Sequence, residues 1–113
     1  MDWNKHQADL MENIQKINEV SPDIVKGYGT LSMAGKKTNY LDAKTRELIA
    51  LAVAVTTRCD GCISVHSKNA LEAGAMKEEI IEALGVAVAL NAGAALVYSS
   101  RVVDAIDNLQ ASN

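Results

Sequence analysis

The 113-residue chain has no phenylalanine, one proline and two cysteines, and aromatic residues make up only 4% of it. Scarce proline and a hydrophobic content of 49% exclude the collagen-like and disordered classes. Two cysteines are too few for the disulfide-stapled scaffold of a small secreted domain. The net charge of −3, with basic residues scattered among acidic ones, argues against a nucleic-acid partner. We interpret the four aromatic residues as packing anchors in a core of smaller side chains: Trp3, Tyr28, Tyr40 and Tyr98.

The length fits a single domain, covering residues 1–113, with room for one small core. The first residues lack the apolar stretch of a signal peptide. The longest apolar run, residues 83–97, contains Asn91 and two glycines. We expect this run to be too short and too interrupted to span a membrane. The sequence therefore predicts a cytoplasmic protein with no membrane partner, in a compartment where thiols are normally reduced.

Helical periodicity and capping residues predict an all-α chain of about six helices. Pro22 suits a first helical turn, Asp42 is a suitable N-cap, and Gly74 suits the position just after a helix. Residues 35–39 are expected to form a loop. The expected helices cover residues 3–20, 21–34, 42–57, 59–73, 77–92 and 94–109.

Two segments are apolar nearly all round: residues 48–55 of the third expected helix, and the stretch 83–97, which covers the end of the fifth and the start of the sixth. A helix of that kind is normally buried on every side. Six short helices in one small subunit cannot cover both of them. We therefore expect a homo-oligomer whose interface buries the remaining apolar surface.

The segment 59–66 carries the residues best suited to chemistry. On a helix, Cys59, Cys62 and His66 fall within a sector of roughly 60°, because successive residues are about 100° apart. Cys62 and His66 are an i, i+4 pair, so the imidazole can activate the thiol, and Cys59 lies close enough to form a disulfide with Cys62. Glu47, at the start of an otherwise apolar helix, would orient the imidazole if it faces His66.

The same residues admit two other interpretations. Two cysteines, a histidine and a glutamate are a possible four-ligand zinc set. The cysteines are also small enough to be inert buried side chains. The redox interpretation is favoured because His66 shares the helix face of the cysteines. Glu47 alone would more often be a solvated residue at a helix start, and His6 is expected at the surface.

Glu47, Cys59, Cys62 and His66 follow the spacing Glu-x11-Cys-x2-Cys-x3-His. This spacing resembles the core of the alkylhydroperoxidase D (AhpD)-like proteins, which belong to the carboxymuconolactone decarboxylase superfamily. The resemblance runs from about residue 41 to residue 93 and includes three further segments: 46–54, 70–75 and 79–84.

The resemblance implies an AhpD-like helical bundle that assembles into trimers or hexamers. It implies a thiol-dependent peroxidase, in which Glu47 and His66 relay protons to the cysteine pair. No bound cofactor and no metal are expected, and a lipoyl-bearing or thioredoxin-like protein would supply the reducing dithiol. We expect Cys62 to attack the hydroperoxide and Cys59 to complete the disulfide. The alternatives are a metal-binding or redox-sensing module with the same site, or a decarboxylase-type enzyme of the same superfamily.

Overall fold

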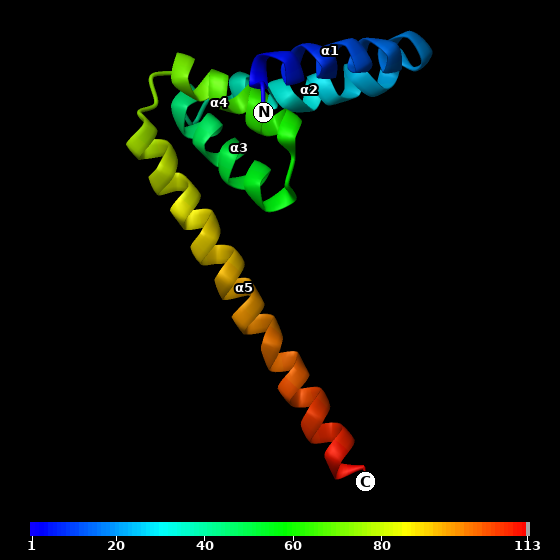
Figure 1. The fold of residues 1–113 in the computed structure, drawn as a ribbon, viewed down its shortest axis with the longest axis vertical. Helices are drawn as coiled ribbons and strands as arrows, with labels where there is room; N and C mark the ends of the chain where they lie inside the picture. The colour runs from blue at the N-terminus through cyan, green and yellow to red at the C-terminus, as the bar shows by residue number, and fades with distance from the viewer. Residues whose placement is uncertain (113) are drawn as a thin grey trace.

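The computed structural model describes residues 1–112 and contains, within them, five α-helices and no strand (Figure 1). The helices are α1 (Trp3–Val20), α2 (Pro22–Thr38), α3 (Ala43–Thr57), α4 (Asp60–Glu72) and α5 (Lys77–Ala111). The predicted all-α class is confirmed. The predicted number of about six helices is wrong by one.

The difference lies in α5, which is continuous where two helices were expected. Gly93 does not end the helix, because a glycine inside a helix costs only about 1 kcal/mol relative to alanine. The Asn91 side chain donates to the Ala87 carbonyl oxygen at 2.7 Å and so bonds within the helix instead of breaking it. The expected loop over residues 35–39 is also mostly helical, since α2 continues to Thr38 and ends at the left-handed Asn39.

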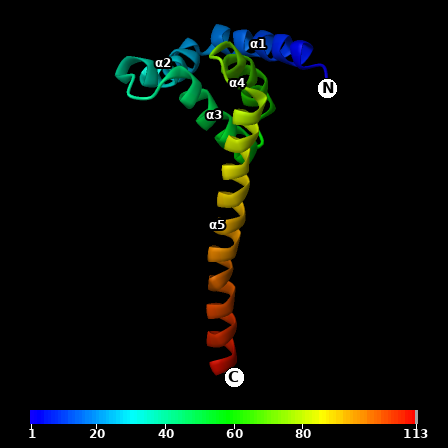
Figure 2. The ribbon, with the colours of Figure 1, turned by 90° about the vertical axis from the view of Figure 1, so that its left-hand side faces the viewer.

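The molecule divides into a head and an arm (Figures 1 and 2). In the head, α1 pairs with α2 and also lies against α4, while α3 packs against both α4 and α5. The amide of Asn91 reaches back to the Thr56 hydroxyl oxygen at 2.8 Å. We call residues 92–111, beyond this contact, the arm, and both views show it extending alone to the C-terminus.

The core lies where α3, α4 and the start of α5 meet. Its largest member is Leu51, which is 3% exposed and packs with Ala70 and Ala75. Leu48, Ile80 and Leu84 are partly buried against this cluster. Six of the described residues are buried. Five of them are apolar, namely Leu51, Ala54, Ala70, Ala75 and Ala87, and the sixth is Ser64. The small side chains among them allow α3 and α4 to approach closely.

The aromatic residues do not anchor this core, contrary to expectation. Tyr40 is 94% exposed, Tyr28 and Tyr98 are about two-thirds exposed, and Trp3 is 42% exposed. The core they were expected to fill is instead made of Leu and Ala side chains.

His6 was expected at the surface but is half-buried. Its ring lies edge-on to Trp3, with ring centroids 5.8 Å apart. Its Nε2 is shielded from solvent and has no hydrogen-bond partner within the described residues. His6 lies one turn before Leu10 on α1, at the face that packs on α4, and an added Cβ on Gly61 would lie only 2.7 Å from Leu10 Cδ2.

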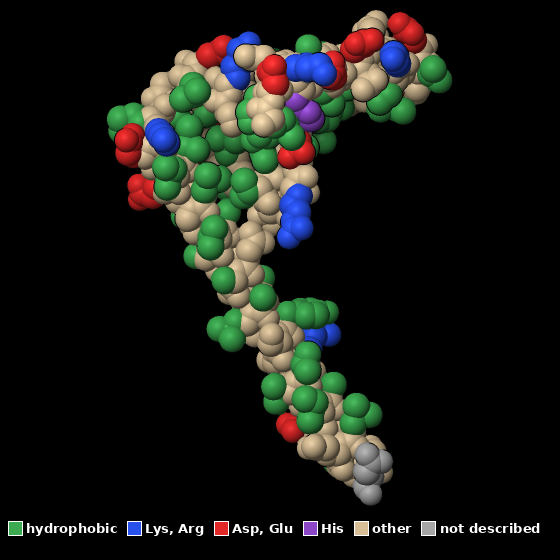
Figure 3. Space-filling model, in the orientation of Figure 1, with side chains coloured by type: hydrophobic (Ala, Val, Ile, Leu, Met, Phe, Trp, Pro, Cys, Tyr) green, Lys and Arg blue, Asp and Glu red, His purple; other side chains and the backbone are tan. Residues whose placement is uncertain are grey.

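The chain is extended for its mass. Its radius of gyration is 19.3 Å, whereas a compact domain of this length has about 13 Å. Its solvent-accessible surface is 8774 Å², whereas a compact folded monomer of this mass has a solvent-accessible surface of about 6000 Å². Figure 3 shows hydrophobic side chains along the arm, with few charged ones among them.

By length and composition alone, α5 would be able to cross a membrane. The expectation that its apolar run is too short was therefore wrong, because the helix continues through Gly93. The core helix of a soluble protein, which is mostly buried, can have the same length and composition, whereas most of α5 is exposed. This feature alone therefore does not place α5 in a membrane.

Candidate redox site

The candidate site lies where α3 ends and α4 begins. Arg58 ends α3 with a left-handed backbone (φ 56°, ψ 52°), which turns the chain sharply into the next helix. Cys59 is the N-cap of α4 rather than its first helical residue, and Cys62 lies in the first turn. His66 follows one turn later, so Cys62 and His66 are neighbours on α4. Glu47 comes from the first half of α3.

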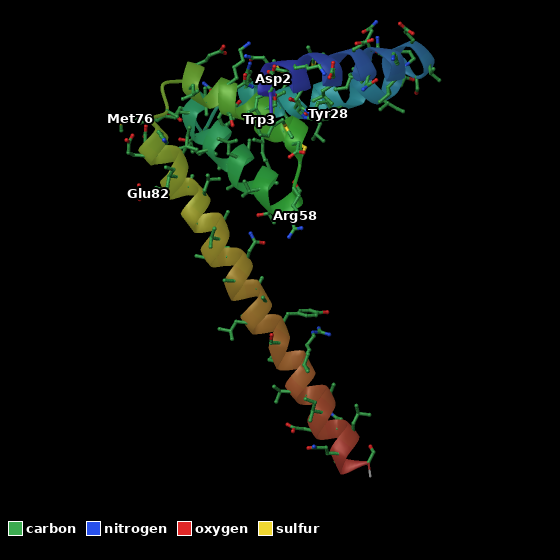
Figure 4. The ribbon with its side chains drawn as sticks, viewed as in Figure 1. Asp2, Trp3, Tyr28, Arg58, Met76 and Glu82 are labelled. Atoms are coloured by element: carbon green, nitrogen blue, oxygen red, sulfur yellow. A yellow bond between two sulfur atoms is a disulfide. The ribbon has the colours of Figure 1, made fainter. Side chains whose placement is uncertain are left out.

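Cys59 and Cys62 are joined by a disulfide, with Cα atoms 5.2 Å apart (Figure 4). Both residues are half-buried. The backbone N–H of Cys62 donates to Cys59 Sγ at 3.1 Å, so this sulfur fills the capping role at the start of α4. After reduction, the same N–H and the positive end of the helix dipole would stabilise a thiolate at this position.

Glu47 and His66 are in direct contact across α3 and α4. The distance from His66 Nδ1 to Glu47 Oε2 is 2.6 Å. The Glu47 side chain is 20% exposed, and the His66 side chain is 26% exposed. When the imidazole is neutral and Nδ1–H donates to the carboxylate, Nε2 is left free to accept a proton. The structure thus places an oriented imidazole one helical turn from Cys62.

The start of α3 is held by contacts that the sequence did not indicate. The guanidinium of Arg46 donates to the carbonyl oxygens of Gly35 and Leu41 and to Asn39 Oδ1. These bonds fix the connection between α2 and α3 immediately before Glu47. The only sequence signal was a charged residue next to Glu47, and that signal does not distinguish an anchor from a solvated side chain.

A salt bridge joins α3 to α5. Lys44 Nζ lies 2.8 Å from Glu79 Oε2. This bond raises the pKa of Lys44 and lowers the pKa of Glu79. At the N-cap of α3, bonds from Thr45 lower the pKa of Asp42 in the same way. Both contacts lie at the surface and fix the register of the helix that carries Glu47.

The zinc interpretation finds no support in the geometry. Over residues 1–112, no group of three His, Cys, Asp or Glu side chains is arranged to hold a metal ion. The two cysteines are bonded to each other, and a disulfide offers no thiolate ligand. Arg58 and Lys68, which flank the motif, are exposed.

Fold and site together define an all-helical protein with a Cys-x-x-Cys disulfide at a helix start and a His–Glu pair beside it. The chain belongs to the carboxymuconolactone decarboxylase family, whose family model matches residues 22–105. The match extends on both sides of residues 41–93, where the resemblance was recognised. Membership of the AhpD-like superfamily is confirmed.

Similar proteins agree with this placement. A Haemophilus influenzae protein, described as uncharacterized, is 48% identical over 104 residues, which are 92% of each chain. The crystal structure of an apo carboxymuconolactone decarboxylase family protein from Legionella pneumophila has a TM-score of 0.73 and 34% identity, over 94% of this chain and 95% of that one. A crystal structure from Methanobacterium thermoautotrophicum has a TM-score of 0.69 and 31% identity, over 76% and 97%. These relatives establish fold and family.

Proposed function

We propose that the protein is a thiol-dependent peroxidase that reduces hydroperoxides with the Cys59–Cys62 pair. The observation that carries the proposal is the Glu47–His66 contact, because it orients an imidazole one turn from Cys62. Peroxide reduction by a thiol needs a thiolate and a proton for the leaving oxygen. One oriented imidazole can serve both needs in turn.

In the first step, His66 accepts the proton of the reduced Cys62 thiol. The thiolate then attacks the terminal peroxide oxygen, so that an S–O bond forms and the O–O bond breaks. The alkoxide leaves and takes the proton from His66 to become an alcohol. Cys62 is left as a sulfenic acid. Glu47 acts as a positioning residue, since it touches the imidazole rather than the peroxide.

In the second step, the Cys59 thiolate attacks the Cys62 sulfur. The S–S bond forms, the S–O bond breaks, and the leaving hydroxide takes up a proton to become water. An external dithiol then restores both thiols by two successive exchanges and is itself oxidised to a disulfide. The bonded pair in the structure corresponds to the oxidised form in this cycle.

The external dithiol would come from a lipoyl-bearing or thioredoxin-like protein. No bound cofactor is required, because both electrons pass through the cysteine sulfurs. The cytoplasm is the compartment we assign, since dithiol reductants operate there. We also propose a homo-oligomer, a trimer or a hexamer, because the subunit exposes much more surface than a monomer of its mass.

The proposal is tested by measuring hydroperoxide consumption with dihydrolipoamide as the reductant. Wild type should consume hydroperoxide catalytically, and Cys62→Ser should fall to the rate of the reductant alone. Ser67→Ala, on another face of α4, is the matched control and should keep the wild-type rate. Equal rates for wild type and Cys62→Ser would refute the peroxidase. One equivalent of zinc that is lost in Cys59→Ser would instead favour a metal-binding module.

The two cysteines are distinguished by trapping the sulfenic acid with dimedone, followed by mass spectrometry. Cys59→Ser should carry the trapped adduct on Cys62, because no resolving thiol remains. Cys62→Ser should carry none on Cys59. The opposite result would exchange the two roles without removing the peroxidase activity.

A further inference from the structure

The subunit exposes far more surface than its mass requires. Its 8774 Å² exceeds the roughly 6000 Å² expected of a compact monomer by about 2800 Å². A standard interface buries about 800 Å² on each partner, and obligate interfaces bury more. The excess is therefore large enough for an obligate interface.

The arm carries a regular apolar stripe. Small or apolar residues recur in α5 at alternating spacings of four and three, which places them on one helix face. Val102 is 59% exposed, Ile106 is 47% exposed, and Leu109 is 67% exposed. The stripe begins at Val88, one turn before the arm, and continues in the arm through Ala92, Ala95, Ser99, Val102, Ile106 and Leu109.

The charged residues of the arm lie away from the stripe and only from residue 101 onward, whereas Leu96 and Val97 make that side apolar before residue 100. Arg101, Asp104 and Asp107 fall at helical positions away from the stripe. A helix with one apolar and one charged face buries the first against a protein and leaves the second in water. Over residues 101–111 this pattern favours a protein partner, and the large excess of exposed surface supports the same choice.

A matching surface lies on the head. A groove of about 350 Å³ runs between α3 and the first half of α5. Ile49 and Val53 line it from α3, and Val86 and Leu90 line it from α5. These four side chains are 50% to 66% exposed, and within residues 1–112 no charged residue lines the groove.

We infer that the arm of a second copy of this chain occupies the groove, and that the exchange is reciprocal. The inference rests on the homo-oligomer proposed above, names its surfaces, and fits the hexamer, since a trimer has no two-fold axis. Each copy supplies both an apolar stripe and an apolar groove, so one two-fold contact covers both at once. In such a pair the two α5 helices run antiparallel, and each arm lies against the partner's α3. The twenty-residue arm is about 30 Å long, which is enough to cover α3 along its full length.

The contact also bears on the redox site. α3 carries Glu47 near its start, followed by the groove residues Ile49 and Val53 within the next two turns. A partner helix over that face would hold α3 in place. It would thereby hold the Glu47 carboxylate against His66.

Sedimentation velocity tests the inference with two charged variants. Ile106→Glu places a charge on the stripe, and Val53→Lys places one in the groove. Val20→Glu, at an 88% exposed apolar position at the end of α1, is the matched control. Wild type and Val20→Glu should sediment as assemblies well above 12.0 kDa. Each of the other two should weaken self-association about 100-fold, because an unpaired charge would be buried.

Mixing the two dissociated variants in equal amounts tests the pairing itself. Restored association is expected, because the lysine introduced in one variant would then meet the glutamate introduced in the other across one contact, while the second contact stays native. Circular dichroism of each variant checks that the helices are intact; Ile106→Glu lies far from the head and should be unaffected.

Four results would overturn the inference. They are a wild-type monomer, intact assembly in both charged variants, dissociation without restoration on mixing, and wild type that floats with phosphatidylcholine vesicles. None of these readouts depends on peroxide turnover. The contact would therefore be confirmed even for a chain without peroxidase activity, and a monomeric peroxidase would refute the contact and the oligomer but not the peroxidase.

Discussion

In the head, Leu51 is 3% exposed and lies among Ala70 and Ala75, whereas in the arm Val97 is 71% exposed and Leu96 is 76% exposed. Both regions are helical, and both are rich in the same aliphatic residues. They differ in that α3 and α4 pack against each other, while the arm extends away from the rest of the described chain. Apolar composition alone therefore does not determine whether a helix is buried within its own chain.

The candidate redox site lies wholly within one of these two regions. Glu47, Cys59, Cys62 and His66 all come from α3, α4 and the turn between them. These four residues lie together within one head, and the arm supplies none of them. A substitution in the arm therefore leaves every residue of the candidate site unchanged.

The largest expected contrast is in stability. Leu51→Ala should lower the free energy of unfolding by about 2–5 kcal/mol, because it leaves a cavity in the core. Val97→Ala should change it by less than about 0.5 kcal/mol in a dissociated subunit, since it removes no buried contact. Urea denaturation in the Ile106→Glu background measures both. Equal losses would mean that the arm is already packed within its own subunit.

Glu47→Gln should lower kcat/KM for hydroperoxide by about 10–100-fold, because it keeps a polar contact to His66 but removes the charge that stabilises the imidazolium. Glu82→Gln, an exposed carboxylate on α5, should be neutral. The pH dependence of thiol alkylation in the reduced protein should change for Glu47→Gln alone. A role for Glu47 that is only structural would leave that dependence as in wild type.

The turn between the site helices gives a smaller effect. Arg58 adopts a left-handed backbone, which costs a residue with a side chain about 1 kcal/mol relative to glycine. Arg58→Gly should therefore raise the thermal midpoint slightly, with part of the gain offset by the more flexible unfolded chain. Arg58→Val should lower the midpoint, since branching at Cβ opposes this conformation. The same midpoint for both variants would show that the turn is not strained.

The smallest expected effect on stability concerns the salt bridge between Lys44 and Glu79. The bond lowers the pKa of Glu79, so its contribution is present above the ordinary value of 4.5 and is lost as pH falls through the lowered pKa. It raises the pKa of Lys44, so its contribution is present below 10.5 and is lost as pH rises through the raised pKa. Urea midpoints of wild type and Lys44→Met should differ only slightly near neutral pH and should converge at both extremes. A constant difference across pH would show that the lysine acts through packing.

The sequence predicted the features that depend on local signals. Asp42 was correctly assigned as an N-cap, and the start of α2 at Pro22 follows from its proline. The candidate site residues were proposed from their spacing and from the family resemblance. The two contacts of the site, the disulfide and the Glu47–His66 pair, lie where that spacing had grouped them.

The features that were missed depend on distant contacts. Gly93 was interpreted as a helix end, but a single glycine does not outweigh the surrounding helix formers. The tyrosines were interpreted as anchors, yet they are exposed because the subunit offers them no core. The anchoring role of Arg46 required knowing that Gly35 and Leu41 lie beside it.

The most direct test of the redox function is a single turnover of the reduced protein. The two thiols are counted, one equivalent of hydroperoxide is added, and the products are mapped by mass spectrometry. The proposal predicts the loss of two thiols per hydroperoxide, one alcohol released, and a disulfide between Cys59 and Cys62. Thiols that remain intact while the hydroperoxide persists would contradict it.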